Sequence, residues 1–558
     1  MTFSCAKRWL FLGTITGGAL MLLESHITVA EDNGTDPAEV AIGEWLFLET
    51  RFAQFFFSHA NGDANARLES GDPVVDVTET LETPLPGPFA GQSINCRACH
   101  LVDEQGGVPD GGNRTYTDFT RRSPVPARDD GNTHTPRNSP PLVNAFRVKR
   151  RELLLHFDGE FATVQDLVKS TLTGRNFGWI PQEQRQALAH IAHIIRHDAG
   201  SGGLAQQFAG AYAAVLKGTD PIIPTEFRLP VRFRIDVTTA SDTEILDVVA
   251  KLIEAYLRSL VFAEDTEGIF NGSPYDVFLR KNDLPRAPDK EESDIDYGRR
   301  LRKLLDDLTT PQFVSEEDGT FTTHQQAFIF GLLELRGLKI FLREPDVVPL
   351  PPEVIAQGTI GNCIACHAPP NFTDFRFHNT GASQEEYDAI HGSGAFAILS
   401  IPDLQTRRHD HNAYLPPTPQ HPDAQGPFRD SPAADKPGHT DLGLWNVYAN
   451  ADFPKPQVRI QRLLCQHNTS CGPRHLLPKT IALFKMPGLR DLGHSAPYFH
   501  TGRQGTIEAV VGFYTGISAL LRAGRLRNGA PELAGMALVT GDIAPLSAFL
   551  KTLNEDYN

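Results

Sequence analysis

The feature that most constrains this chain is a pair of short cysteine motifs, CRACH at residues 96–100 and CIACH at residues 363–367. In each motif the cysteines stand at positions i and i+3, so one helical turn presents both thiols on one face. Two thiols placed in this way can bond to the two vinyl groups of one porphyrin, and the histidine that follows lies under the iron as its proximal ligand. The alternative is a redox or zinc Cys-x-x-Cys motif with an accidental histidine, but here both pairs are followed by histidine. We therefore predict two covalently attached haem c groups, held by Cys96, Cys99 and His100 at the first site and by Cys363, Cys366 and His367 at the second.

The first 30 residues are typical of a secretory signal peptide. Lys7 and Arg8 precede a mostly apolar segment at residues 9–23, and small residues occupy positions 28–30. An uncleaved membrane anchor is the alternative, but the apolar segment is short. We predict a periplasmic protein, which agrees with haem attachment after export. No later stretch is long and apolar enough to span a bilayer, so we do not expect an integral membrane protein after signal cleavage.

Charge and the remaining cysteines narrow the partners and the compartment. The formal net charge of −16 makes nucleic acid a poor partner, because its phosphates would be repelled. Such a charge suits a small basic redox protein. Cys465 and Cys471 flank a short polar stretch, and in an oxidising compartment we expect them to form a disulfide that closes a small loop.

An internal repeat surrounds the two motifs. Gly43 and Gly337 lie in apolar-periodic segments upstream of each motif, and residues 157–168 parallel residues 500–511 downstream. Both downstream segments have a glycine turn, a threonine suited to cap a helix, and then an amphipathic helix. The pattern predicts two cytochrome-c-like haem domains related by internal duplication.

The rest of the chain indicates a mainly α fold with long connections. Helical spacing is found at residues 182–196, 242–260 and 543–553, whereas proline-rich polar segments at residues 281–294 and 414–438 predict loops. The expected organisation is a signal peptide at residues 1–30, an N-terminal haem domain at 31–180, a helical insertion at 181–335 and a C-terminal haem domain at 336–558.

Four blocks, the first of which is the helix before the first haem, resemble the di-haem cytochrome c peroxidase family, including its MauG-type branch. The other three are PRNSP at residues 136–140, FHNTG at 377–381, and PGLR at 487–490 leading to APYFH at 496–500. The resemblance covers both haem domains but little of the insertion. It implies a peroxidase-type oxidoreductase that reduces hydrogen peroxide with electrons relayed from the C-terminal haem to the N-terminal haem. The electron donor would be a small cytochrome or copper protein, and oxygen is the alternative oxidant.

The resemblance also implies ligands. His100 would be proximal at the first haem and His367 at the second, whose distal methionine in the peroxidase branch aligns with Tyr514. Tyrosine at this position resembles the MauG-type branch; the alternative is that Tyr514 is an aromatic core residue, and Met486 is a fallback ligand. The family further holds a calcium ion between its domains. Carried over, its ligands are Asn138, Ser495 and Pro497, although these residues could equally form hydrogen-bonded turns.

The first haem site departs from the family pattern. Phe157 replaces a tryptophan between the haems, and Leu167 and Phe177 align with the distal glutamine and glutamate. Because a carboxylate helps to move protons as the O–O bond breaks, its loss questions efficient peroxidase turnover. Glu160 is a candidate substitute base.

The displaceable distal histidine of the peroxidases aligns with Asp130. His134 and His156 are nearby candidates for that role, although a histidine near a haem motif is more often structural. Trp179 could approach the first haem, but a packed core tryptophan is the favoured interpretation.

Three functions follow from these observations. The first is peroxide reduction. The second is a MauG-like oxidase that uses high-valent haem to modify a protein or an organic substrate, favoured by Tyr514 and the missing carboxylate. The third is a non-enzymatic di-haem electron carrier.

Overall fold

The computed structural model describes residues 36–66, 95–96, 99–100, 125, 128–132, 134–146, 153–200, 205, 210–322, 324–465 and 470–556. The predicted signal peptide lies outside this part of the chain. Within it the fold is mainly helical, as predicted, and its strands form a two-stranded antiparallel sheet. A search of the described helices found none that combines the length and the apolar character needed to cross a membrane.

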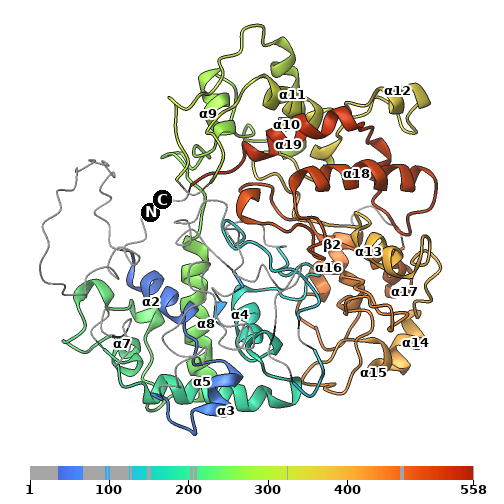
Figure 1. Ribbon diagram of the computed structural model, residues 1–558. Coiled ribbons are helices and arrows are strands. Elements are labelled where there is room, and N and C mark those ends of the chain that lie inside the picture. The colour runs from blue at the N-terminus through green and yellow to red at the C-terminus, as the bar shows by residue number, and fades with distance from the viewer. Residues whose placement is uncertain are drawn as a thin grey trace, which may run out of the picture.

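The first apolar core lies at the lower left of Figure 1 and runs from Ala38 to Leu260. Its helices are α2 (Ala38–Phe47), α3 (Gln54–His59), α4 (Val164–Leu172), α5 (Gln184–His197), α7 (Tyr212–Lys217) and α8 (Asp242–Ser259). Helix α8 is buried along one side and packs against α2, α4 and α5. It begins with a capping box in which Ser241 Oγ accepts a hydrogen bond from the backbone of Glu244.

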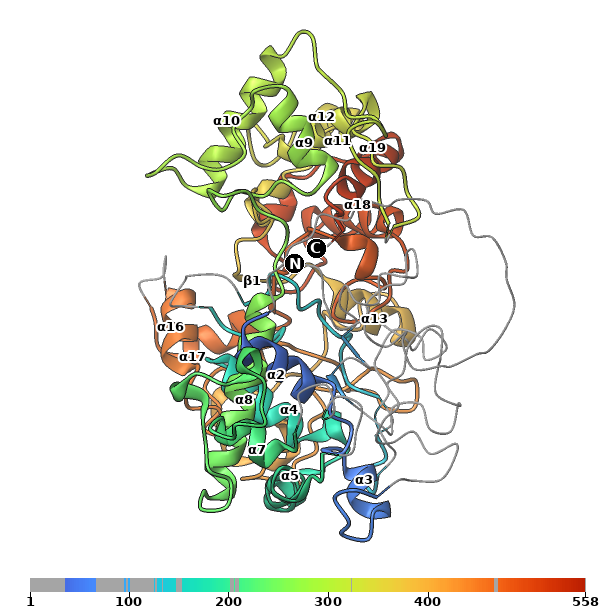
Figure 2. The ribbon, with the colours of Figure 1, turned by 90° about the vertical axis from the view of Figure 1, so that its left-hand side faces the viewer.

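The second core occupies the upper part of Figures 1 and 2 and joins segments from Tyr275 to Leu553. Its helices are α9 (Pro274–Lys281), α10 (Asp294–Asp307), α11 (Leu332–Leu342), α12 (Pro352–Gln357), α18 (Ile507–Arg522) and α19 (Thr540–Lys551). The helical insertion predicted for residues 181–335 is therefore not one packed body. Its part up to Leu260 belongs to the first core, and its part from Tyr275 onward belongs to the second.

A third core lies at the lower right of Figure 1 and is built mainly from residues between Tyr387 and Phe484. Its helices are α13 (Ala382–His391), α14 (Leu404–His409), α15 (His411–Tyr414), α16 (Gln457–Cys465) and α17 (Pro473–Leu476). Strands β1 (Phe377–His378) and β2 (Phe484–Lys485) border this region, with Phe377 opposite Lys485. Short 3-10 helices connect the regions: η5 (Arg175–Phe177), η6 (Pro181–Glu183), η7 (Thr225–Phe227), η8 (Val231–Phe233), η9 (Cys363–Ala365), η10 (Leu444–Asn446), η11 (Leu477–Thr480), η12 (Leu492–His494) and η13 (Pro531–Gly535).

Each of the first two cores contains a pair of helices that cross at a glycine. Helix α2 packs on α8, and a Cβ added to Gly43 would lie 2.1 Å from the carbonyl oxygen of Leu252. Helix α11 packs on α19 in the same way, and a Cβ on Gly337 would lie 1.9 Å from the carbonyl oxygen of Pro545. Only glycine allows backbones to approach this closely, which explains why both upstream helices carry one.

The segments that follow the motifs also match in local geometry. Leu155 pairs with Phe161 in an isolated antiparallel bridge, and Tyr498 pairs with Gln504 in another. In both segments a threonine then caps the next helix: Thr163 Oγ1 accepts from Asp166 N at the start of α4, and Thr506 Oγ1 accepts from Ala509 N at the start of α18.

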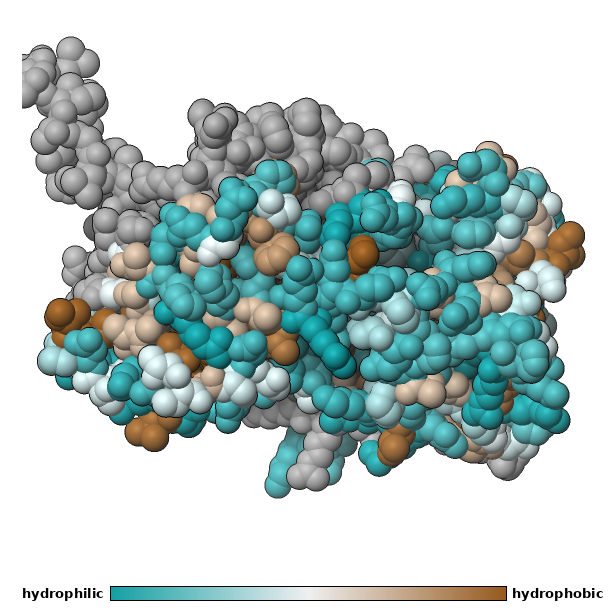
Figure 3. All heavy atoms as spheres, turned by 90° about the horizontal axis from the view of Figure 1, so that it is seen from below, coloured by the Kyte–Doolittle hydropathy of each residue, from teal (hydrophilic) through white to brown (hydrophobic). Residues whose placement is uncertain are grey.

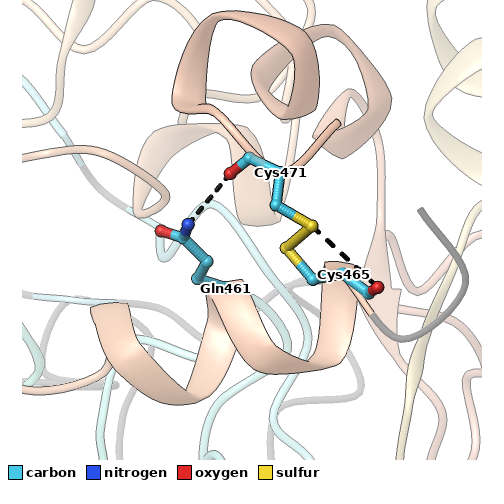
Figure 4. The surroundings of a disulfide bond; sticks show 3 residues. All are labelled: Gln461, Cys465 and Cys471. Carbon is cyan, nitrogen blue, oxygen red and sulfur yellow. Dashed lines mark hydrogen bonds between the residues drawn. A yellow bond between two sulfur atoms is a disulfide. The ribbon is translucent and has the colours of Figure 1, made fainter. Parts of the chain in front are cut away.

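The periodicity predicted several elements correctly. Helices α5, α8 and α19 confirm the three predicted helical segments to within a few residues, and the loop predicted at residues 281–294 separates α9 from α10. Cys465 and Cys471 form the predicted disulfide, and Gln461 Nε2 donates a hydrogen bond of 2.9 Å to the carbonyl of Cys471 (Figure 4).

The face seen from below is mostly hydrophilic, and its apolar side chains are scattered (Figure 3). Isolated exposed apolar residues are normal on protein surfaces and do not by themselves indicate a docking site.

Candidate haem sites

The two cysteine motifs adopt the same local turn. His100 N donates a hydrogen bond of 2.9 Å to the carbonyl of Cys96, and His367 N donates one of 2.8 Å to the carbonyl of Cys363. The same backbone hydrogen bond therefore closes on the first cysteine in both motifs.

Both histidines are oriented by a backbone carbonyl. His100 Nδ1 lies 2.9 Å from the carbonyl oxygen of Pro140, and His367 Nδ1 lies 2.8 Å from that of Phe372. A hydrogen bond at Nδ1 fixes the ring and leaves Nε2 as the ligand atom, the arrangement common for metal-binding histidines. Burial lowers the pKa of each histidine to about 4, so both rings stay neutral and can donate a lone pair to iron.

A cavity of about 320 Å³ lies beside the first motif. Its wall includes Cys96, Cys99 and His100 together with the apolar side chains of Phe47, Val125, Leu142, Phe146, Leu155, Leu167, Val168, Leu172, Phe177, Ile253 and Leu257. An apolar cavity that begins at two cysteines and a neutral histidine fits a porphyrin. On the other side the cavity reaches Asn371, Thr373 and Phe375, which follow the second motif.

Cationic groups are part of the same wall and could face the carboxylates of a porphyrin. Arg137 forms an ion pair of 2.7 Å with Asp158 and a second one with Asp441, so it joins the two halves of the chain. Arg429 pairs with Asp158 and Glu160. Lys485 also lines the cavity, and burial lowers its pKa to about 8.

The wall of the first cavity is apolar at two positions where the family pattern has polar residues. Leu167 and Phe177, which align with the family's glutamine and glutamate, both line the cavity. Thr171, one turn after Leu167 on α4, also lines it. At these two positions the wall therefore offers neither a carboxylate nor an amide for proton transfer.

Tyr514 lies near the second motif, on α18. Burial raises the pKa of its phenol, with smaller contributions from Cys366 and Cys363. Tyr514 and Cys363 are both packed against the second core. The ring contacts Phe499 and Phe513 in edge-on geometry, at 6.1 and 5.5 Å between ring centroids. Within the part of the chain that the structure describes, its hydroxyl makes no hydrogen bond. The phenol oxygen is therefore available to act as a ligand to iron. The role of Tyr514 as a distal ligand stays a prediction.

The residues predicted as catalytic at the first haem, His134 and Glu160, do not line the cavity. His134 is exposed and is not part of the cavity wall. Glu160 also lies outside the wall, 3.3 Å from His156 Nδ1 and paired with Arg429. Although burial opposes the effect, Arg429 and His156 hold the pKa of Glu160 well below its usual range. A carboxylate with so low a pKa binds protons weakly, which does not favour its predicted role as a base.

Of the other candidates near the first haem, some line the cavity and others do not. Asp130 forms an ion pair of 2.6 Å with Arg175 and does not line the cavity. His156 and Phe157 do line it, as does Met486, the fallback ligand. Trp179 is fully buried in the first core, where its Nε1 donates to the carbonyl of Phe52; it is a packed core residue, as favoured.

The predicted calcium residues partly converge. Asn138 Nδ2 lies 2.5 Å from the carbonyl oxygen of Pro497, and Asn138 N donates a hydrogen bond of 2.7 Å to the carbonyl of His500. Ser495 lines the same cavity as Asn138, and its hydroxyl donates to the carbonyl of Asp491. The contact between Asn138 and Pro497 therefore joins the two halves of the chain.

Sequence reasoning missed several polar residues of the first cavity, chiefly Lys485, Arg429 and His494. Lys485 directly precedes Met486 and the PGLR block, which was the available signal. Arg429 lies in a segment predicted only as a loop, and no spacing in the sequence relates it to the first motif.

The chain is similar to proteins of known structure. Twenty-nine chains match. Among them is the crystal structure of the diheme peroxidase BthA from Burkholderia thailandensis E264, at 16% identity over 93% of this chain and 86% of that one, with a TM-score of 0.43. Another is a MauG-like protein associated with microbial copper homeostasis, at 16% identity over 94% of this chain and 91% of that one, with a TM-score of 0.40. Both proteins are of the kind that the sequence blocks resemble. No family model and no curated protein sequence matches.

Proposed function

We propose that this chain is a secreted di-haem c-type oxidoreductase of the peroxidase type, which reduces hydrogen peroxide at the N-terminal haem with electrons relayed from the C-terminal haem. The bound haems would supply the redox chemistry. His100 and His367 would hold the two irons through Nε2, while the carbonyls of Pro140 and Phe372 orient the two imidazoles. A small electron-donor cytochrome or copper protein would deliver the electrons.

The observation that carries the proposal is a difference at one matched position. Residues 155–171 and residues 498–514 run in the same register, from the isolated bridge through the capped helix, and they end at Thr171 and Tyr514. Thr171 lines the first cavity. Because Tyr514 occupies the corresponding position, this supports the proposal that Tyr514 faces the second haem. A threonine would offer the first iron no ligand atom and leave room for peroxide, whereas a tyrosine would supply a ligand to the second iron and suit it to electron relay.

A MauG-like oxidase is the second candidate, favoured by the apolar wall at Leu167 and Phe177. With no carboxylate or amide at these two positions, proton delivery to a bound peroxide would be slow, and oxidation of a protein or an organic substrate becomes the competing outcome. Of the two candidates His134 and His156, only His156 lines the cavity. We propose that His156 donates the proton to peroxide and that Glu160 positions its ring.

The variant Tyr514→Phe tests the ligand assignment. We expect the spectrum of the C-terminal haem to change while that of the N-terminal haem stays as in the wild type, because only the second iron would lose its phenol oxygen. Phe513→Leu, which alters the adjacent aromatic residue, is the control. An unchanged C-terminal haem spectrum in Tyr514→Phe would contradict the assignment.

Peroxide added to the fully reduced protein separates the functions. Steady turnover with a donor cytochrome supports the peroxidase. A long-lived oxidised species without turnover supports the MauG-like oxidase. No reaction would leave a di-haem electron carrier and overturn both enzymatic proposals.

Three further parts of the proposal concern organisation. We propose that the two haem units arose by duplication and that the first extends to Leu260, since its core continues through α8. A calcium ion held by Asn138, Ser495 and Pro497 would fix the two halves relative to each other. The proposed location is the periplasm, after cleavage of the signal peptide.

A further inference from the structure

Two histidines and an aspartate meet in the third core, apart from the first haem cavity. His411 begins the short helix α15, His421 lies in the following loop, and Asp452 follows η10. One donor atom from each residue lies within 4.8 Å of the donors of the other two. Helix α15 is at the lower right of Figure 1, at the opposite end of the C-terminal half from α19.

The donor atoms converge on one carboxylate oxygen. His421 Nδ1 lies 2.8 Å from Asp452 Oδ2, and His411 Nε2 lies 3.3 Å from the same oxygen. Ligands bound at about 2.0–2.2 Å around one tetrahedral ion are roughly 3.3 Å apart. The distance between His411 Nε2 and Asp452 Oδ2 already has this value, and that between His421 Nδ1 and the same oxygen is about half an ångström shorter.

Hydrogen bonding alone leaves this arrangement incomplete. The two imidazoles are stacked with ring centroids 3.7 Å apart, and both face the single negative charge of Asp452. His411 Nε2 is buried and makes no hydrogen bond within the described chain. Two stacked imidazolium rings would repel each other, whereas two neutral rings can direct lone pairs at a shared cation.

Neighbouring groups hold the carboxylate in place. The side chain of Asp452 is 4% exposed, and Thr418 Oγ1 donates to its Oδ2 at 2.6 Å. Thr418 Oγ1 also accepts from His421 N at 3.2 Å, so one hydroxyl positions two of the three candidate ligands. Asn450 Oδ1 accepts from Asp452 N. Such outer contacts are typical of metal sites.

We propose that His411, His421 and Asp452 bind a divalent transition-metal ion of the zinc class. Two imidazole nitrogens and one carboxylate oxygen are a donor set that zinc accepts, and one that calcium and magnesium, which prefer oxygen, do not. The side chain of His421 is 38% exposed, so the fourth position opens to solvent and takes water or a group from outside. The ion ties the loop that carries His421 to the segment that carries Asp452.

Zinc titration of the full-length, haem-loaded protein after chelator treatment tests this proposal. By calorimetry, and by metal analysis after dialysis, we expect one zinc ion bound per chain in an excess of calcium. The variants His411→Ala and His421→Ala should lose this binding with unchanged haem spectra. Thr418→Val should weaken it by about 10- to 100-fold, because the carboxylate loses its positioning group. Zinc should also raise the melting temperature of the wild type but not that of His421→Ala.

His409→Ala is the matched control, since His409 lies two residues before His411 and its side chain is 85% exposed beside Asp410. It should bind zinc as the wild type does. A wild-type protein that binds no zinc would overturn the proposal. So would His411→Ala and His421→Ala variants that bind zinc as tightly as the wild type, because the ion would then lie elsewhere.

Discussion

Residues 155–171 and residues 498–514 have the same backbone conformation, but they carry different side chains at corresponding positions. His156 and Phe499, the residues after the first bridge partner, have φ values of +64° and +66°, and Gly159 and Gly502 also have positive φ. Non-glycine residues rarely adopt this conformation, so the match at corresponding positions shows that the two turns are built alike. The chemistry lies in what each turn presents.

The difference between the halves concerns the room left beside each motif. The first half presents Leu167 and Thr171 to a cavity of about 320 Å³, whereas the second carries the bulky Tyr514 in the core against which Cys363 also packs. Two segments of matching geometry therefore present unlike side chains. Under the proposed function, a few side chains on α4 and α18, rather than the fold, would distinguish the two haem sites.

The largest expected effect comes from removing one attachment motif at a time. Replacing Cys96 and Cys99 by alanine, or Cys363 and Cys366 by alanine, should leave one covalent haem, measurable by the mass of the protein and its haem absorbance. Loss of the first motif should abolish the reaction with peroxide. Loss of the second should leave the binding of peroxide at the first iron unchanged. Two covalent haems in either variant would contradict the assignment of the motifs.

A tyrosine introduced into the first half should make it resemble the second. Thr171→Tyr places a phenol in the first cavity and should lower the rate of the peroxide reaction by about tenfold or more, which corresponds to roughly 1.4 kcal/mol of barrier. Stopped-flow spectroscopy measures that rate. Ser170→Tyr, on the same helix but outside the cavity wall, is the control. An unchanged rate in Thr171→Tyr would mean that this position does not limit access to the first iron.

The helix crossings should be equally sensitive in both halves. In Gly43→Ala and Gly337→Ala the new Cβ would meet a carbonyl oxygen at 2.1 and 1.9 Å, and each variant should lose about 1–3 kcal/mol of unfolding free energy. Chemical denaturation checks this loss. Gly512→Ala is the control, because its Cβ would meet nothing within 4 Å on α18 and should be neutral or slightly stabilising. If one of these variants were as stable as the wild type, the helix crossing in that half would not depend on its glycine, and the two crossings would not be equivalent.

The smallest effect is expected at the helix caps. Thr163→Ala and Thr506→Ala each remove a hydroxyl that accepts from the first turn of α4 or α18, at a cost of about 0.5–2 kcal/mol in unfolding free energy. Thermal melting in parallel with Thr163→Ser and Thr506→Ser, which keep the hydroxyl, isolates the cap. Equal losses would support matched turns, whereas a loss in one half alone would argue against them.

Local pattern predicted the helices better than the boundaries. The apolar periodicity of α5, α8 and α19 is a property of the segment itself, so the sequence was sufficient to place each helix. The predicted insertion at residues 181–335 divided between two cores because α8 packs on α2, about 200 residues earlier in the chain. Periodicity identifies which face of a helix is buried but not the partner that buries it.

The sequence by itself determined the two attachment motifs, their histidines, the disulfide pair and the caps of α4 and α18, because each depends on residues only a few positions apart. Only the tertiary structure decided which polar groups face the first cavity. Arg429 and Lys485 reach it from distant segments, while His134 and Glu160, near the first motif in sequence, do not line it. The physical reason is that ion pairs such as Arg429 with Glu160, and the packing of distant segments, set the direction of a side chain. Neither has a fixed spacing along the chain.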